Sequence, residues 1–154
     1  MGKCKYCGLS AGWFRDEHKE CKQINVKSLA DISALSCQAI IEHMDENETR
    51  SLILELQLQG HVSKQELGTA VGEGIKSAVE HFLDDNVLSE QEESSIDRYL
   101  KVLPISAEAL SAFGLSQKLV KASIIRSISR GQVPGPKFTI DGNLPFLFQK
   151  SEKL

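Results

Sequence analysis

The sequence predicts a mainly α-helical fold, in which a small Cys/His finger precedes a helical bundle and a short β-hairpin-like tail follows it. Three observations predict this fold. Four potential metal ligands lie within the first 21 residues. Apolar residues at helical spacing, separated by capping and breaking residues, then continue to Gly131. After Pro134 the apolar residues alternate instead, as they do in strands.

The four potential ligands, Cys4, Cys7, His18 and Cys21, are spaced C-x2-C-x10-H-x2-C. A C-x2-C turn supplies two thiolates from one tight loop, and Gly8 gives that loop a permissive backbone. An H-x2-C pair places two more donors about one helical turn apart on the same face of a helix. The pattern therefore predicts one Zn²⁺ ion with four protein ligands. Such a site leaves no open position for substrate or water, so we expect a structural zinc rather than a catalytic one.

Two further features of the finger follow from its sequence. Asp16 is placed to cap a helix that opens at Glu17. The large apolar residues between the two ligand pairs are Leu9, Trp13 and Phe14, and we expect them to form a miniature core.

Reduced thiols without metal, or disulfides, are the alternatives for the cysteines. Disulfides fit poorly because the N-terminus has no apolar signal segment and Cys37 lies apart, in a helical pattern. We expect Cys37 to be a small buried side chain. No apolar stretch approaches the ~20 residues that span a bilayer. The sequence thus predicts a cytoplasmic protein with reduced thiols and no membrane span.

Two helices are predicted in the next part of the chain from apolar residues at helical spacing. Apolar residues from Val26 to Met44 follow one stripe, and the helix of the finger is expected to run directly into it. A shorter apolar helix follows over 52–58, and Gly60 is placed to end it.

Two capping boxes, S-x-x-E at 63–66 and 89–92, then mark helix starts. These helices should run to about Leu83 and Leu103, where Pro104 follows.

The last predicted helices cover 107–113 and 116–130, with Gly114 turning the chain between them. Residues 138–140 look like a strand that enters an Asp-Gly turn, and 144–148 alternate as a second strand would. An isolated hairpin is marginally stable in water, so we expect this tail either to pack on the helices or to continue beyond the sequence.

No catalytic constellation emerges, so we predict that the chain is not an enzyme. Gly68, Gly72 and Gly74 suggest a phosphate loop, but Glu73 replaces the glycine that the motif requires. Close approach of another helix along the Gly68/Gly72 face is the better interpretation. The three other histidines are isolated and expected at or near the surface; they are His43, His61 and His81.

The net charge of −3 is unevenly distributed. Basic residues of the finger are candidate contacts for nucleic acid or a protein partner, namely Lys3, Lys5, Arg15, Lys19 and Lys22. A second basic stretch contributes Lys118, Arg126 and Arg130 on one side of a helix. A solvated helix face is the alternative for this second stretch.

The finger text CKYCGLSAGWFRDEHKEC resembles the N-terminal zinc finger of a group of poorly characterised bacterial proteins. The stretch from Val71 to Gly131, with DDNVLSEQEE at its centre, is similar to their second part, a TerB-like (tellurite-resistance-like) helical region. The ending GNLPFLFQKSEKL looks like a junction into a further β-rich region. The resemblance implies a zinc finger over 1–24, linking helices over 25–60, a TerB-like bundle over 61–132 and an extended or β tail over 133–154.

These observations favour a non-enzymatic zinc-finger interaction module, either a protein–protein adaptor or the regulatory part of a larger bacterial protein. A nucleic-acid-binding protein that uses the basic finger is one alternative. The other is the regulatory N-terminal part of an enzyme or membrane-associated protein whose active part lies beyond Leu154. The sequence does not predict an oligomeric state.

Overall fold

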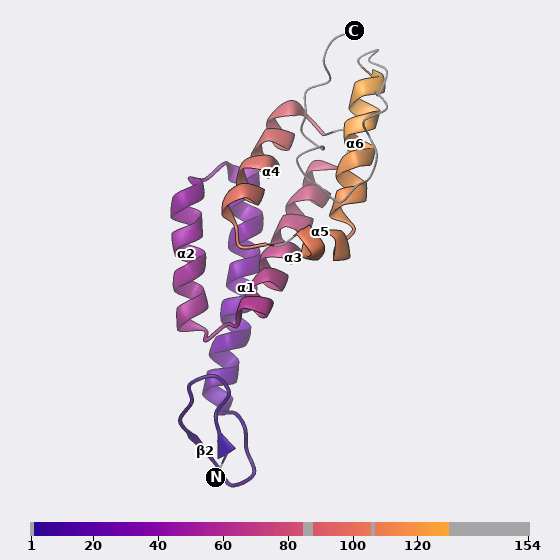
Figure 1. The fold of residues 1–154 in the computed structure, drawn as a ribbon. Helices are drawn as coiled ribbons and strands as arrows, with labels where there is room; N and C mark the ends of the chain where they lie inside the picture. Colours follow the sequence, from indigo (N-terminus) through magenta and orange to yellow (C-terminus); the bar gives the residue numbers. More distant parts are fainter. Residues whose placement is uncertain (1, 85–87, 106, 130–154) are drawn as a thin grey trace.

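The computed structural model describes residues 2–84, 88–105 and 107–129, and these form a mainly helical chain (Figure 1). The predicted fold class is confirmed for this part; the predicted tail hairpin lies outside it. In chain order the elements are β1 (Gly2–Lys3), β2 (Ser10–Gly12), α1 (Lys19–Glu42), α2 (Glu46–Gln59), α3 (Lys64–Phe82), α4 (Glu90–Val102), α5 (Ala107–Ala112) and α6 (Leu115–Ser129).

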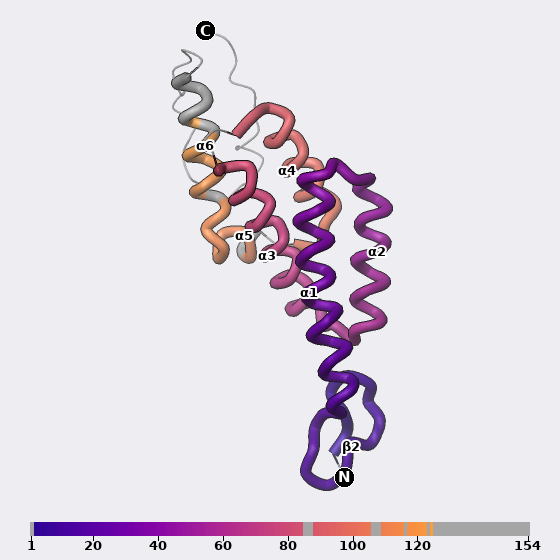
Figure 2. Tube along the Cα trace, turned by 180° about the vertical axis from the view of Figure 1, so that it is seen from behind, coloured from indigo at the N-terminus to yellow at the C-terminus, as the bar shows by residue number. Residues whose placement is uncertain are grey.

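The molecule is elongated because α1 is longer than the helices packed around it. Its 24 residues span about 36 Å, and the finger extends from the N-terminal end of this helix, away from the bundle (Figures 1 and 2). The expectation that the helix of the finger continues into the next one is confirmed. The boundary implied at residue 24 therefore falls inside a continuous helix.

One apolar core joins the helices. It contains the central part of α1, the inner face of α2, most of α3 and residues of α4 and α6; its fully buried large side chains include Ile32, Ile40, Ile53, Ile75, Ile96, Tyr99 and Leu115. Residues 25–60, expected to link the finger to the bundle, thus form part of the bundle itself. The predicted stripe leaves the core at its start, since Val26 is 58% exposed.

Glycines of α3 allow close packing, as predicted, but on a different face. A Cβ on Gly74 would lie 2.3 Å from the carbonyl oxygen of Ser33 in α1, and one on Gly72 would lie 2.2 Å from the Phe113 ring. A Cβ on Gly68 would meet nothing closer than 3.8 Å. The Gly68/Gly72 face was therefore not the one that meets α1, because α1 packs against the side of α3 that carries Gly74.

Capping residues and a glycine in the sequence determine where several helices begin and end. Both capping boxes are formed: Ser63 with Glu66 starts α3, and Ser89 with Glu92 starts α4. Gly114 adopts φ +66° between α5 and α6, a conformation that glycine tolerates best.

Buried polar side chains fasten the helices to one another. Asn25 donates from Nδ2 to the carbonyl of Gly60 at 3.0 Å, joining α1 to the end of α2. The Tyr99 hydroxyl of α4 donates to the carbonyl of Met44, which follows α1. Because buried carbonyls need donors, these bonds fix how α2 and α4 sit against α1.

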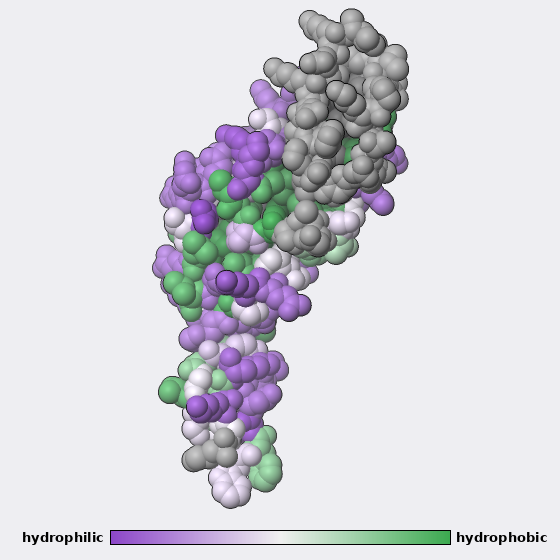
Figure 3. Space-filling model, viewed as in Figure 1, coloured by the Kyte–Doolittle hydropathy of each residue, from purple (hydrophilic) through white to green (hydrophobic). Residues whose placement is uncertain are grey.

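The surface is mostly polar over the helices, with apolar side chains exposed at the finger and along parts of the bundle (Figure 3). None of the described helices is long and apolar enough to cross a membrane.

Candidate metal centre

The four predicted ligands come together at the N-terminal end of α1. Cys4 and Cys7 lie on the knuckle between β1 and β2, His18 lies immediately before α1, and Cys21 lies in its first turn. Their ligand atoms all lie within 4.8 Å of one another. In the described part of the chain no other group of three or more His, Cys, Asp or Glu side chains gathers in this way.

The distances within the cluster match those of a tetrahedral metal site. His18 Nδ1 lies 3.4 Å from Cys7 Sγ and 3.6 Å from Cys21 Sγ. In a zinc site the metal–sulfur and metal–nitrogen bonds, about 2.3 and 2.0 Å long, place neighbouring sulfur and nitrogen ligands about 3.5 Å apart. The residues present therefore fit a single ion bound by three thiolates and one imidazole.

The second ring nitrogen of His18 is held by the backbone. Nε2 lies 2.9 Å from the carbonyl oxygen of Ser10 in β2, and a carbonyl can only accept. Nε2 is therefore the protonated nitrogen, and the lone pair of Nδ1 is free to face the sulfurs of Cys7 and Cys21. A hydrogen bond of this kind orients a metal-binding histidine and strengthens it as a donor.

The thiols occupy unequal environments. Burial of Cys4 opposes its charged form, but backbone N–H groups of Cys7, His18 and Tyr6 outweigh burial and hold the pKa of Cys4 at about 6. Burial, followed by the neighbouring thiols of Cys7 and Cys4, raises the pKa of Cys21 to about 11. Crowded thiols resist losing several protons without a compensating cation, which a divalent ion supplies.

Short hydrogen bonds shape the knuckle that carries the first two ligands. Cys4 N–H donates to the Leu9 carbonyl at 2.7 Å, and Gly8 N–H donates to the Cys4 carbonyl at 2.8 Å. Gly8 adopts φ +73°, which explains why a glycine follows Cys7. The predicted permissive turn is thus confirmed.

Helix α1 begins two residues later than the sequence indicated. Asp16 does not cap a helix at Glu17; His18 occupies the N-cap position without a side-chain capping bond, and Lys19 is the first helical residue. The Asp16 carbonyl instead accepts from Lys5 N–H at 2.8 Å, so this segment closes on the knuckle. The ligand His18 therefore stands where a capping side chain would normally be.

Glu17 joins the two halves of the finger. Its carboxylate lies 2.9 Å from Lys5 Nζ on the knuckle and 2.8 Å from Lys22 Nζ on α1. Hydrogen bonds first from Lys22 and then from Lys5 lower the pKa of Glu17. The lysines are about half exposed, at 52% and 56%, so solvent screens both pairs and they add little to stability. The sequence could have identified Glu17 as the partner of Lys5 and Lys22, because it lies between them in the chain.

The predicted miniature core of the finger does not exist. Leu9, Trp13 and Phe14 are 68%, 80% and 97% exposed. The interior of the finger is instead taken by the ligand atoms, with Cys4 buried at the centre. A loop this short has no second layer to cover three large side chains, so the clustered Cys and His side chains occupy its interior in place of an apolar core. We refer to Leu9, Trp13 and Phe14 as the apolar tip.

The other predicted contact residues are distributed as follows. Lys5 and Lys22 are engaged by Glu17, whereas Lys3, Arg15 and Lys19 are exposed and form no ion pair within the described residues.

On α6, Lys118 pairs with Glu80 of α3 at 2.7 Å. Arg130 and the side chain of Arg126 lie outside the described part. Of these three side chains only that of Lys118 is described, so the predicted basic face stays a prediction.

The remaining candidates stay apart from the cluster. His43, His61 and His81 are exposed. Cys37 is partly buried against the core, and burial raises its pKa. It is therefore a packing residue, as the sequence indicated.

Comparison with known proteins gives no relative: no family model, no curated protein and no solved structure matches this chain. The resemblance to zinc-finger proteins with a TerB-like region accordingly stays a prediction.

Proposed function

We propose that this chain is a non-enzymatic interaction module, in which a zinc-bound finger presents the apolar tip to another protein chain. The observation that carries the proposal is the exposure of Leu9, Trp13 and Phe14 on a finger that metal ligands, rather than these residues, hold together. Zinc is the ion that suits three thiolates and an imidazole in a closed tetrahedron.

Exposure of the apolar tip to water is unfavourable in free energy. Burying a large apolar side chain contributes about 1.5–3 kcal/mol, so three exposed ones represent several kcal/mol that a partner can recover. Tryptophan is also among the residues enriched where binding energy concentrates in protein interfaces. These properties support a docking role for the tip.

Charge indicates the kind of partner surface. Arg15 follows Phe14 directly, and neither Arg15 nor Lys3 forms an ion pair in the described structure. A matching partner therefore carries an apolar pocket edged by carboxylates.

The metal is tested by measuring bound zinc per chain in purified protein. One equivalent is expected in the wild type, and none in Cys7→Ser. The Co²⁺-substituted protein should show the absorption of tetrahedral thiolate coordination. Wild-type protein that refolds its finger without metal would overturn the zinc assignment.

The docking role is tested by placing a photo-crosslinking amino acid at Phe14 in the native host, with Gln23 as the matched exposed control on α1. A discrete crosslinked protein from position 14 alone is expected, and Trp13→Ser or Cys7→Ser in the same chain should remove it. An adduct that persists in the Cys7→Ser background would show that the folded finger is not needed.

Single-stranded nucleic acid is a second candidate, because exposed Trp13 and Phe14 lie beside the unpaired cations Lys3 and Arg15. Aromatic stacking next to cations is how such strands are bound without sequence preference. Against it, Glu17 engages Lys5 and Lys22. Titration of labelled single- and double-stranded DNA and RNA at two salt concentrations decides: salt-sensitive binding that Arg15→Glu removes would favour nucleic acid over protein.

A further inference from the structure

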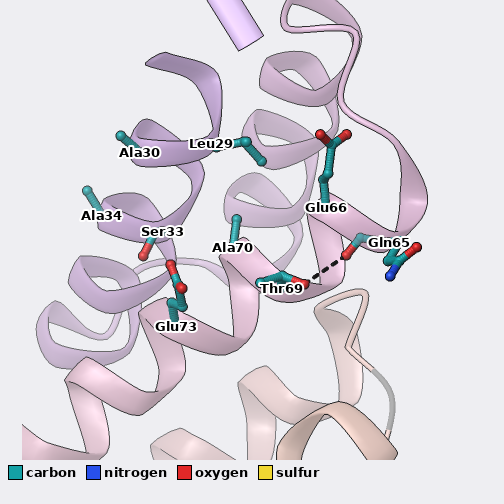
Figure 4. A pocket seen from close by; sticks show the side chains of 9 residues that line it. All are labelled: Leu29, Ala30, Ser33, Ala34, Gln65, Glu66, Thr69, Ala70 and Glu73. Atoms are coloured by element: carbon teal, nitrogen blue, oxygen red, sulfur yellow. Dashed lines mark hydrogen bonds between the residues drawn. The ribbon is translucent and has the colours of Figure 1, made fainter. Parts of the chain in front are cut away.

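A shallow groove of about 720 Å³ lies between α1 and α3, on the N-terminal side of the close contact at Gly74. Figure 4 shows Leu29 and Ala70 between the two helices, and Glu73 reaching from α3 towards Ser33 of α1. The small and apolar side chains that line it are Leu29, Ala30, Ala34 and Ala70. Because most of these are alanines, neither helix fills the space with its own side chains.

The groove is acidic along α3. Glu66 and Glu73 both line it. Glu73 is exposed and pairs with no cation in the described structure, and the carboxylate of Glu66 accepts hydrogen bonds from Ser63 without losing its charge. An occupant that suits this groove is therefore bulky, apolar and positively charged.

The apolar tip has these properties. Trp13 and Phe14 supply two exposed aromatic rings, and Arg15 adds a cation at the next position. The same chain thus carries an apolar surface with a positive edge and an apolar groove with a negative edge, which are complementary in charge.

The finger is set apart from the α1 side of its own chain's groove. Groove residues 29–34 lie 11 to 16 positions after His18 along one continuous helix, a separation of about 16–24 Å. Because α1 has no break, it fixes this separation, although Lys5 on the knuckle is near enough to the α3 end of the groove to interact with the charge of Glu66. A second copy whose α1 runs antiparallel can place its finger there instead.

We propose that the apolar tip of one copy docks into the α1/α3 groove of a second copy, in a reciprocal pair. This inference rests on the docking role proposed for the tip and names its partner. A twofold dimer uses both tips and both grooves, so no docking surface remains free to add further copies into a filament.

The area favours a reciprocal pair over a single contact. Two aromatic rings bury about 150–250 Å² each, so a tip buries about 300–500 Å². Two reciprocal contacts then bury about 600–1,000 Å² of tip surface, and the grooves with the helix surfaces around them supply the rest of the ~1,200–2,000 Å² that specific stable interfaces bury. One contact alone would fall below it.

Sedimentation velocity of the zinc-loaded full chain tests the proposal over about 1–100 µM. The wild type is expected to form a concentration-dependent dimer. Glu73→Arg and Arg15→Glu should each raise the dissociation constant at least ~10-fold, and the double charge reversal should restore it to within ~3-fold of the wild type. Glu55→Arg, the same charge change on exposed α2, is the matched control and should have no effect.

The outcomes separate the two proposals. A wild type that stays monomeric at about 100 µM overturns the self-docking, as does a dimer that ignores Glu73→Arg or is not rescued by the double reversal. A monomer whose position 14 crosslinks to a different protein overturns self-docking alone. A monomer without any specific crosslink overturns both proposals, whereas a crosslinked homodimer supports both.

Discussion

His18 donates its Nε2–H to the carbonyl oxygen of Ser10 at 2.9 Å, while its Nδ1 faces the sulfurs of Cys7 and Cys21. One imidazole thus ties strand β2 to the thiol cluster and to the start of α1. The folded structure of the finger depends on this ring and the three thiols, because the large apolar residues of the finger form no core.

Cys21→Ser should lose the metal and unfold the finger, while the helical bundle stays folded. The reason is that the apolar core begins at Ile32 and contains no residue of the finger. Zinc content and far-ultraviolet circular dichroism measure the two effects, with Lys19→Ala as a control that should change neither. Loss of most of the helical signal would contradict the separation of finger and core.

Gly74→Ala should destabilise the fold by about 2–4 kcal/mol, because its Cβ would meet the Ser33 backbone carbonyl, which cannot move alone. Gly68→Ala is the matched control on the same helix. Its Cβ would make only an ordinary contact, 3.8 Å from the Pro104 carbonyl oxygen, so it should leave stability unchanged or add up to ~1 kcal/mol. Urea unfolding of both variants is the measurement, and equal effects would refute the assigned crossing point.

Ser63→Ala should cost about 0.5–2 kcal/mol through loss of the α3 capping box. Hydrogen bonds from the Ser63 side chain and then its backbone N–H lower the pKa of Glu66 below its usual value. The stability from this pair is therefore present above the unfolded-state pKa and is lost as pH falls through the folded-state pKa. Unfolding curves at neutral and acidic pH should show a smaller acid-induced loss in Ser63→Ala than in the wild type.

The control for that comparison is Ser77→Ala, an exposed serine inside the same helix that caps nothing. Its stability should follow the wild-type pH profile. A profile that matches Ser63→Ala would mean that the capping box does not cause the pH dependence.

Tyr99→Phe should cost about 1–3 kcal/mol, because the partly buried carbonyl of Met44 loses its donor while the buried ring keeps its packing. Thermal unfolding at neutral pH measures the loss. Burial raises the pKa of Tyr99, so its contribution is present below the unfolded-state pKa and is lost as pH rises through the folded-state pKa. Tyr6→Phe, in the finger, should leave the stability of the bundle unchanged.

Sequence reasoning succeeded where the signal is local. The ligand spacing brought Cys4 and Cys21 into one cluster, and the two S-x-x-E boxes located the starts of α3 and α4 within a residue. Each of these patterns is complete within a few residues or a single loop, so no tertiary contact is needed to interpret it.

Predictions from the sequence failed where a residue's environment depends on side chains from other parts of the fold. Trp13 looks like a core residue in any short segment, but burial needs neighbours that the finger lacks. Gly68 and Gly74 differ only in which of them faces the crossing of α1, and helical spacing does not specify that point. The acidic groove was likewise hidden, since Ala34 and Glu73 come from helices far apart in the sequence.

Because α1 is one unbroken helix, it fixes the orientation of the finger around the helix axis relative to the bundle. Each helical residue turns the chain by about 100°, so one residue inserted between Lys22 and Asn25 would rotate the tip around the helix axis while Lys22 stays with Glu17 and Asn25 stays with Gly60. Seven inserted residues would bring it back to within about 20° and move it roughly 10 Å outward. The direction in which this protein presents its aromatic side chains is thus set by the length of a helix.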